Sequence, residues 1–363
     1  MKSSKSRCSL FVGCALSLLV SCAAVVGDSG EDYFPITQNG KLGFINKTGK
    51  IVISPQFDSG VREEGGSFSE GLTAVQVGDK WGYIDKTGKF IIAPKFKQTS
   101  PPSLFHEGLA RVDTEDRTSG VIDKSGEFVE ALKFIQGLSM FSEGLAIARK
   151  GEKSGYVDKA GKFVIEARFA EADLFKEGLA AVKLEDTSES KYGFVDKTGK
   201  MVIEPQFSQA ESFSEGFAAI DFGGKYGYID RSGKVVIAPQ FDSAFPFSEG
   251  LAKVVIFGKD GLINKAGFID KTGTFVISPH FEQLPGGNSL NYRGFKEGLA
   301  VVEVNNKSGY IDKTGKMIIA PKYDYGSDFR GGLASVTIGL EAGTQRFYYI
   351  DTTGKIVWEQ KAN

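Results

Sequence analysis

Residues 82–96 read GYIDKTGKFIIAPKF, and close variants of this stretch recur along the whole chain. Asp85 can accept backbone hydrogen bonds across a type I turn, and Gly88 can take the left-handed conformation that follows it. β-Branched and aromatic residues come next. Pro94 marks where this strand leaves its sheet, because proline has no N–H for a ladder. The stretch therefore predicts a β-hairpin with a three-residue loop and a G1 bulge.

The hairpin phrase occurs nine times in the sequence. Its copies begin at Gly43, Gly82, Gly120, Gly155, Gly193, Gly227, Gly267, Gly309 and Tyr348. The spacing from Gly43 to Gly309 gives a period of roughly 38 residues, which is typical of repeat arrays. The aspartate and the two glycines of each copy form a repeated structural motif, here exemplified by Gly82, Asp85, Gly88, Asp196, Gly199, Asp230, Gly233, Asp312 and Gly315.

A second phrase alternates with the first and has the form Phe-x-Glu-Gly-Leu. It occurs at Phe68, Phe105, Phe141, Phe175, Phe213, Phe247 and Phe295, with a leucine replaced by Phe217 in one copy and FRGGL at Phe329 as a variant. The apolar residues that follow it in the sequence predict another strand. Each repeat is therefore predicted to be a three-stranded antiparallel meander that buries its faces against its neighbours. The fold class is an all-β tandem array.

These two alternating phrases resemble the WG-repeat family, which is named for the pair that stands here as Trp81 and Gly82. The resemblance covers about residues 33–358. It implies a bacterial β-repeat protein from a family with no general enzymatic activity and no settled ligand. Other residues occupy the tryptophan position in most copies, so Trp81 is a weak candidate for a site.

The repeats could form an open superhelix or a propeller-like ring. We expect the open array, because nine units exceed the usual four to eight blades and propeller blades generally have four strands.

The N-terminus resembles a bacterial lipoprotein signal. Lys2, Lys5 and Arg7 precede an apolar run, Leu10 to Val20, which is too short to span a bilayer comfortably. Cys22 follows in a lipobox-like sequence and would carry the lipid. We therefore expect residues 1–21 to be a signal peptide, 22–32 a lipidated tether, 33–358 the array and 359–363 a tail. The expected location is the cell envelope, as an outer-membrane lipoprotein. The alternative is a soluble periplasmic or secreted protein.

Composition excludes several function classes. The other cysteines, Cys8 and Cys14, lie inside the signal, and the two histidines, His106 and His280, are far apart in sequence. The sequence therefore predicts no metal site, no cofactor and no cysteine or histidine chemistry. Removal of the three signal cations leaves a formal charge of about −4, from 44 basic residues less three against 45 acidic ones. This balance does not favour nucleic acid as a partner.

The repeated acids are candidates for a site. One series is Asp85, Asp123, Asp158, Asp196, Asp230, Asp270 and Asp312, and the other is Glu70, Glu107, Glu143, Glu177, Glu215, Glu249 and Glu297. A paired set could hydrolyse a glycoside, and such acids could also bind a cation. Because a catalytic pair is needed only once, we expect these residues to cap turns and strands in every repeat.

Departures from the repeat are the candidate binding regions. They are residues 97–106, 257–267 and 284–294, and the candidate binding side chains are Trp81, Tyr192, Tyr226 and Tyr292. Within 257–273 two hairpin phrases compete, starting at Gly261 and at Gly267. We expect the later one to form the turn, because only it is followed by Pro279 and Phe281 at the repeat spacing.

The leading hypothesis is a monomeric, non-catalytic binding or scaffolding protein that presents its repeats to a protein or envelope polymer. Membrane contact would be through the lipid only. The alternatives are a glycan-binding, lectin-like protein and, less favoured, a hydrolase that uses an Asp/Glu pair.

The lipobox makes a direct prediction for Cys22→Ala. The variant has no thiol to acylate, so we expect it to lose an acyl label and to leave the membrane fraction, since two or three acyl chains are what hold the domain there. Metabolic labelling with a fatty acid and membrane pelleting would measure both effects. Membrane pelleting of the natural sequence without any acyl label would contradict the anchor.

Overall fold

A computed structural model describes residues 32–58, 67–97, 101–113, 119–133, 135–258, 264–283, 294–339 and 345–360. Cys22, the expected signal peptide, most of the tether and Tyr292 lie outside these residues. The described residues form antiparallel β-sheets and one turn of 3-10 helix, η1 (Glu130–Leu132). None of the helical structure found in them is long and apolar enough to cross a bilayer.

The described strands form nine blades in chain order, each built on up to three long strands; blades 1 and 2 join in one sheet through a single bridge. The first strands are β1 (Tyr33–Gln38), β4 (Leu72–Val77), β7 (Leu109–Asp113), β9 (Ala146–Lys150), β13 (Leu179–Lys183), β17 (Phe217–Asp221), β21 (Ala252–Ile256), β24 (Leu299–Val304) and β28 (Leu333–Ile338). The second strands are β2 (Lys41–Asn46), β5 (Lys80–Asp85), β8 (Ser119–Asp123), β10 (Lys153–Val157), β14 (Tyr192–Asp196), β18 (Tyr226–Asp230), β22 (Asn264–Ile269), β25 (Lys307–Asp312) and β29 (Arg346–Asp351). The third strands are β3 (Ile51–Asp58), β6 (Phe90–Phe96), β11 (Phe163–Phe169), β15 (Met201–Phe207), β19 (Val235–Phe241), β23 (Phe275–Gln283), β26 (Met317–Tyr323) and β30 (Ile356–Glu359). The all-β repeat array predicted from the sequence is confirmed.

Two features depart from the expected three-stranded unit. Blades 5, 6, 7 and 9 gain a fourth strand of two residues, which pairs with the first strand of the blade. These short strands are β12 (Glu171–Ala172), β16 (Gln209–Ala210), β20 (Ser243–Ala244) and β27 (Tyr325–Gly326). Blade 3 has only β7 and β8 among its described residues, and η1 stands where a third strand would follow.

The hairpin loop has the predicted geometry. In blade 2 the Gly88 N–H donates to the Asp85 carbonyl oxygen at 2.9 Å, and the Asp85 N–H donates to the Lys89 carbonyl oxygen at 2.9 Å. Gly88 has a φ of 83°, in the left-handed region. The loop is therefore a type I turn followed by a left-handed glycine.

Gly82, at the start of the phrase, is required for a different reason. A Cβ at this position would lie 2.5 Å from the Ile92 carbonyl oxygen and 2.8 Å from the Pro94 nitrogen. The register of β5 and β6 shifts at this point, so the third strand bulges over the glycine. The proline lies in this irregular stretch, where no ladder N–H is needed.

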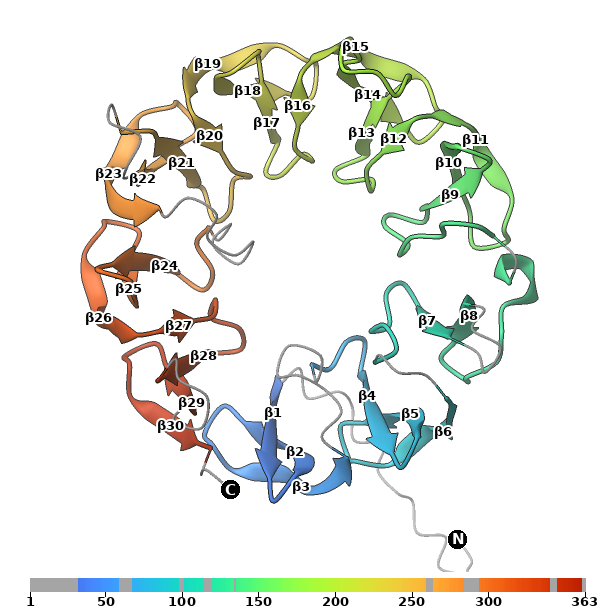
Figure 1. Cartoon of the computed structure of the whole chain (residues 1–363), viewed down its shortest axis with the longest axis vertical. Coiled ribbons are helices and arrows are strands. Elements are labelled where there is room, and N and C mark those ends of the chain that lie inside the picture. The colour runs from blue at the N-terminus through green and yellow to red at the C-terminus, as the bar shows by residue number, and fades with distance from the viewer. Residues whose placement is uncertain are drawn as a thin grey trace, which may run out of the picture. The chain divides into compact units, whose positions relative to one another are not determined.

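The array closes into a ring within Glu31–Asn363 (Figure 1). Between neighbouring blades, an aromatic ring of the second strand packs on the phenylalanine that precedes the next blade, as in Tyr83 and Phe105, whose centroids lie 4.9 Å apart. The Tyr83 hydroxyl also donates to a main-chain carbonyl two residues before that phenylalanine. Tyr349 of blade 9 makes contacts of the same two kinds with β1 of blade 1, packing on Phe34 at 5.4 Å and donating to the Pro35 carbonyl oxygen at 2.9 Å.

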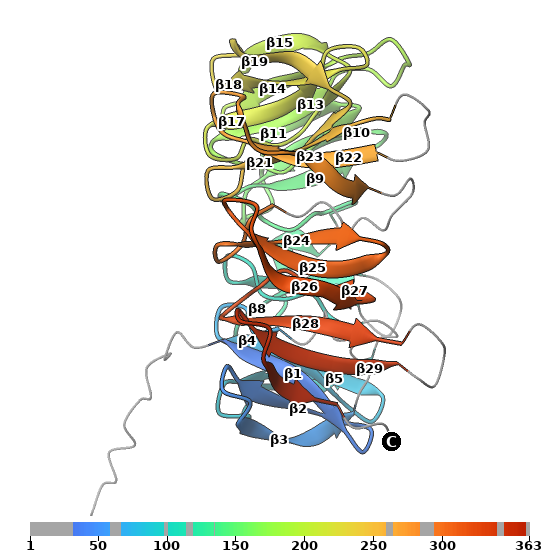
Figure 2. The same ribbon diagram turned by 90° about the vertical axis from the view of Figure 1, so that its left-hand side faces the viewer.

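The expectation of an open array is therefore wrong, and the propeller-like alternative describes the arrangement. An open array would expose an apolar face at each end, whereas Ile36 and Ile45 of blade 1 are buried in one cluster with Leu333 and Phe347 of blade 9. Removal of these faces from water favours closure. The third strands lie on the outside of the ring (Figure 1), and Figure 2 shows strands of blades 8 and 9 running across its thickness.

The competing hairpin phrases resolve as expected. The Gly273 N–H donates to the Asp270 carbonyl oxygen at 3.0 Å, so the later phrase forms the turn. Lys265, from the earlier phrase, lies inside β22 and pairs with Ile256 and Glu282. The residues 259–263 lie outside the described part of the chain.

The turn glycines also touch the neighbouring blade, and this predicts how two matched alanine variants should differ. Gly199 (φ 84°) and Gly216 (φ 88°) share a left-handed backbone, but a Cβ on Gly199 would lie 3.0 Å from Cγ2 of Ile165, whereas Gly216 faces open space. We expect Gly216→Ala to lower the free energy of unfolding by about 1–2 kcal/mol, because alanine is strained in a left-handed backbone conformation. Gly199→Ala should lower the free energy of unfolding by about 1 kcal/mol more, because its Cβ would crowd the Ile165 side chain.

Urea unfolding of both variants and of the natural sequence would measure the difference. Equal costs for the two alanines would show that the turn does not pack tightly on the preceding blade.

Candidate binding surfaces

The Phe-x-Glu-Gly-Leu phrase forms a two-residue hairpin turn. Ser69 and Leu72 exchange backbone hydrogen bonds at 2.9 and 3.0 Å. Glu70 has a φ of 51° and Gly71 a φ of 85°, so both lie in the left-handed region. This is the pattern of a type I′ turn. Glutamate rarely adopts this conformation, because its Cβ crowds the backbone there.

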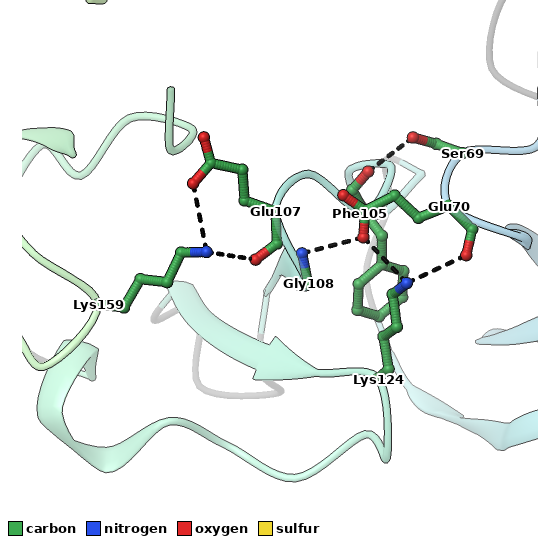
Figure 3. A network of polar contacts seen from close by, with 7 residues as sticks. All are labelled: Ser69, Glu70, Phe105, Glu107, Gly108, Lys124 and Lys159. Atoms are coloured by element: carbon green, nitrogen blue, oxygen red, sulfur yellow. Dashed lines mark hydrogen bonds and ion pairs between the residues drawn. The ribbon is translucent and has the colours of Figure 1, made fainter. Parts of the chain in front are cut away.

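The glutamate of this turn binds the next blade (Figure 3). The Glu70 Oε2 accepts the Gly108 N–H at 2.9 Å and lies 3.1 Å from the Lys124 Nζ. The Ser69 hydroxyl donates to the Phe105 carbonyl oxygen at 2.7 Å. The sequence did not predict this role, because a side chain was expected to cap its own repeat.

The same contact recurs around the ring, and we call the set the carboxylate belt. Its glutamates and the glycines of the next blade that donate to them are Glu70 and Gly108, Glu107 and Gly144, Glu143 and Gly178, Glu177 and Gly216, Glu215 and Gly250, Glu249 and Gly298, and Glu297 and Gly332. Hairpin lysines pair with Glu70, Glu107, Glu143, Glu215 and Glu249.

Three carboxylates of the belt, Glu70, Glu143 and Glu249, have lowered pKa values. Partial burial acts to raise the pKa of Glu143, but hydrogen bonds from Lys197 and from the Gly178 N–H outweigh it, so that the pKa lies below its ordinary value. The pKa values of Glu70 and Glu249 are lowered in the same way, again against the effect of partial burial.

The hairpin aspartates are engaged within their own turns. The Asp85 Oδ1 accepts the N–H groups of Thr87 at 2.8 Å and Lys89 at 3.1 Å. Corresponding bonds are made by Asp123, Asp158, Asp196, Asp230, Asp270 and Asp312. Among the described residues no group of three or more histidine, cysteine, aspartate or glutamate side chains could hold a metal ion.

The predicted aromatic candidates do not converge on a site. Trp81 is 1% exposed and belongs to the core, so its ring is not available to a ligand. Tyr192 is half-buried, donates to the Glu171 carboxylate and lies under the Lys183 Nζ at 5.4 Å from the ring centroid. Tyr226 packs against the core of blades 6 and 7.

Exposed apolar side chains lie mainly in two places in the blades, along the third strands, as Val202 does, and at the ends of the first strands. Leu72, at the start of the first strand, pairs with Asp85, at the end of the second. The Phe-x-Glu-Gly-Leu turn and the hairpin turn therefore lie at the same end of each blade. The first strand ends at the opposite end, which we call the far face. Val77, Leu184, Phe222, Phe257 and Ile338 stand at or just after the far end of a first strand, with exposed fractions of 36–51%. Leu184, Phe222 and Phe257 come from the consecutive blades 5, 6 and 7, and we call these three the apolar arc.

A cavity of about 450 Å³ lies where the repeat is broken, between blades 3 and 4. His106 of the departure at 97–106 is among its lining residues. His280 is exposed on β23 of blade 7, so the two histidines come from different blades.

The described residues thus define a closed ring of antiparallel blades held together by side chains. The chain belongs to the family described as WG containing repeat, whose model matches residues 43–81, 81–116, 120–153, 155–187, 192–226, 226–259, 267–307 and 309–339. This confirms the resemblance seen in the sequence. No curated protein matches the chain.

One solved structure shares the fold at low sequence identity, and another aligns only weakly. The crystal structure of the eukaryotic initiation factor aligns with a TM-score of 0.62 and 12% identity, over 92% of this chain and 96% of that one. Hsv2 from Kluyveromyces lactis aligns with a TM-score of 0.38 and 10% identity, over 81% of this chain and 96% of that one. The first of these likenesses concerns the fold alone, and the second is too weak to support an argument.

The lowered pKa of Glu143 predicts that this contact of the belt is sensitive to acid. A carboxyl group with a lowered folded pKa adds stability above its unfolded pKa, about 4.3 for glutamate, and loses it as the pH falls through the folded pKa. We expect Glu143→Gln to lower the free energy of unfolding by about 0.5–1 kcal/mol at pH 7, a small effect because the Glu143–Lys197 pair is partly exposed. Its stability should also fall less steeply than that of the natural sequence as the pH falls below about 5.

Urea unfolding at a series of pH values would measure this, with Glu166→Gln on the exposed face of β11 as the control. A Glu143→Gln variant with the pH dependence of the natural sequence would contradict the role of the belt.

Proposed function

We propose that this protein is a non-catalytic binding or scaffolding protein of the cell envelope, and that it presents the far face of its ring to a protein partner. The basic and apolar N-terminal residues and Cys22 support export and lipid anchoring. The scaffold would then be held at a membrane surface by its lipid, with the ring free to meet a partner.

The apolar arc is the observation that carries this proposal. Phe257 is 51% exposed, Leu184 38% and Phe222 36%, and they come from three consecutive blades. Apolar and aromatic side chains gathered on a surface are typical of interaction sites, where burial by a partner gains free energy. Aromatic and aliphatic anchors that a partner buries are typical of protein interfaces, so the arc favours a protein over an envelope polymer.

The repeated acids support a binding role over catalysis. The Asp85 carboxylate and its equivalents accept N–H groups of their own turns, and the Glu70 carboxylate and its equivalents accept N–H groups of the next blade. A carboxylate that holds the backbone in this way is not free to act as an acid, a base or a nucleophile.

The experiment is a comparison of two triple variants of the signal-less chain. The arc variant carries Leu184→Ser, Phe222→Ser and Phe257→Ser. The matched control carries Val202→Ser, Val236→Ser and Val276→Ser, which alter side chains of similar exposure (41%, 37% and 44%) on the outer strands of the same three blades. Both variants should keep the far-UV circular dichroism of the natural chain.

Proteins cross-linked to the natural chain in envelope extracts would be identified, purified and titrated against all three chains. We expect binding to weaken at least about tenfold for the arc variant and less than twofold for the control, because a buried aromatic anchor contributes more than 1 kcal/mol. Equal binding by both variants would contradict the arc, and binding of a purified envelope glycan in place of any protein would favour the lectin-like alternative.

A further inference from the structure

The junction between blades 3 and 4 lacks an aromatic ring that the other junctions between successive blades have. At those junctions a ring of the second strand packs on the phenylalanine that precedes the next blade, with centroids 4.7–5.1 Å apart. The residues that supply this ring are Phe44, Tyr83, Tyr156, Phe194, Tyr228, Phe268 and Tyr310. Blade 3 has Val121 at the same position, and the phenylalanine that precedes blade 4 is Phe141.

The cavity of about 450 Å³ lies where this ring is missing, because Val121 and Phe141 both line it. The third strand of the blade does not fill the gap. Glu130 stands where blade 2 has the buried Ile92, and it is exposed on η1. The cavity therefore replaces both a ring of the second strand and an isoleucine of the third.

The tyrosines at the other junctions show what such a space can hold. The Tyr83 hydroxyl donates to the Ser103 carbonyl oxygen at 2.8 Å, two residues before Phe105. Tyr156, Tyr228 and Tyr310 donate at 2.7–2.8 Å to the corresponding carbonyl groups, those of Asp173, Phe245 and Ser327. Burial raises the pKa of Tyr83 and of Tyr156 above its ordinary value, so this environment favours the neutral phenol.

Ser139 presents the corresponding carbonyl group between blades 3 and 4. It lies two residues before Phe141 and is part of the cavity wall. The Ser139 N–H donates to the Ile147 carbonyl oxygen at 3.0 Å, and its hydroxyl accepts the Ile147 N–H at 2.8 Å. Ser103 makes the same two bonds with Arg111, at 3.0 and 2.7 Å. The backbone of Ser139 is thus held as that of Ser103 is, where the next carbonyl group accepts a tyrosine hydroxyl.

We propose that this cavity binds a small neutral phenol, which takes the place of the missing tyrosine ring. The phenol ring packs on Phe141, and its hydroxyl donates to the Ser139 carbonyl oxygen. Leu104, Leu132 and Leu138 form an apolar wall around the remaining volume, which has room for an alkyl substituent. A volume of this size, lined by apolar side chains and a few polar groups, is typical of small-molecule sites. This site is separate from the apolar arc, which belongs to blades 5–7.

Titration calorimetry and thermal unfolding of the signal-less chain with 4-methylphenol, which is the side chain of tyrosine, test the proposal. We expect saturable one-to-one binding and a raised melting temperature, because a ligand that binds only the folded chain stabilises it. Toluene has the same ring and methyl group without the hydroxyl. It should bind at least about fivefold more weakly, because the hydrogen bond is lost.

Val121→Tyr supplies the missing ring from the chain itself. We expect this variant to have a raised melting temperature, because it fills the cavity, and to bind 4-methylphenol at least about tenfold more weakly. The matched control is Val202→Tyr, the same substitution at a side chain that is 41% exposed on β15. The control and the arc variant should both bind 4-methylphenol as the natural chain does.

Tyr156→Val makes the equivalent gap between blades 4 and 5, and it tests the proposal without requiring that Val121→Tyr fold. We expect a lowered melting temperature and a second site for 4-methylphenol, so that the stoichiometry rises from one to two.

Absence of saturable binding to the natural chain, or equal affinity for toluene, would overturn the proposal. A folded Val121→Tyr variant that binds 4-methylphenol as the natural chain does would place the ligand elsewhere and would also overturn it. Loss of binding in the arc variant would do the same, by placing the phenol on the protein-binding surface.

Discussion

The hydrogen bond from a glycine N–H of one blade to the glutamate carboxylate of the preceding blade is the constraint on which the order of the ring depends. Apart from one bridge between blades 1 and 2, no strand ladder among the described residues joins one blade to the next. Side chains must therefore fix how blades sit against each other. Glu143 does this from a left-handed backbone position, which aims its carboxylate at Gly178 and Lys197. The unfavourable local conformation is offset by bonds that only the assembled array provides.

The junction where blade 9 meets blade 1 is held by different contacts from the other junctions. In the last copy, FRGGL, Gly331 stands where other copies have glutamate, and a Cβ on it would lie 2.5 Å from the Cβ of Asp32. The preceding Arg330 donates to the Phe68 carbonyl oxygen at 3.1 Å, and its Nε lies 3.9 Å from the Asp32 carboxylate. An arginine can span this junction because its guanidinium presents several donors at the end of a long side chain. The variant copy is thus the one that meets the start of the array.

Local features of the fold were predictable from the sequence, and features that join distant residues were not. The Asp85 to Lys89 turn follows from rules that act over five residues, and it formed as predicted. The partner of Glu70 is 38 residues away, so no local rule could identify it. Closure depends on the packing of Phe34 on Tyr349, and counting units against the usual size of propellers could not reveal that contact. Trp81 is a weak site candidate from the sequence because other residues occupy its position in most copies, and the structure buries it in the core.

The same distinction explains where binding is expected on a repeat protein. Positions that are alike in most copies already have a structural role: Gly82 lies under the bulge of the third strand, Asp85 binds its own turn and Glu70 binds the next blade. At the far ends of the first strands it is the backbone that is bound, as where the Asp242 carboxylate accepts the Phe257 N–H at 2.9 Å. The connection that follows these strands varies from two residues between β4 and β5 to eight between β13 and β14. Selection can change these side chains without loss of the ring. An apolar side chain that stays 51% exposed at such a position, as that of Phe257 does, is not part of the motif that builds each repeat, which makes the far face the better candidate for a partner.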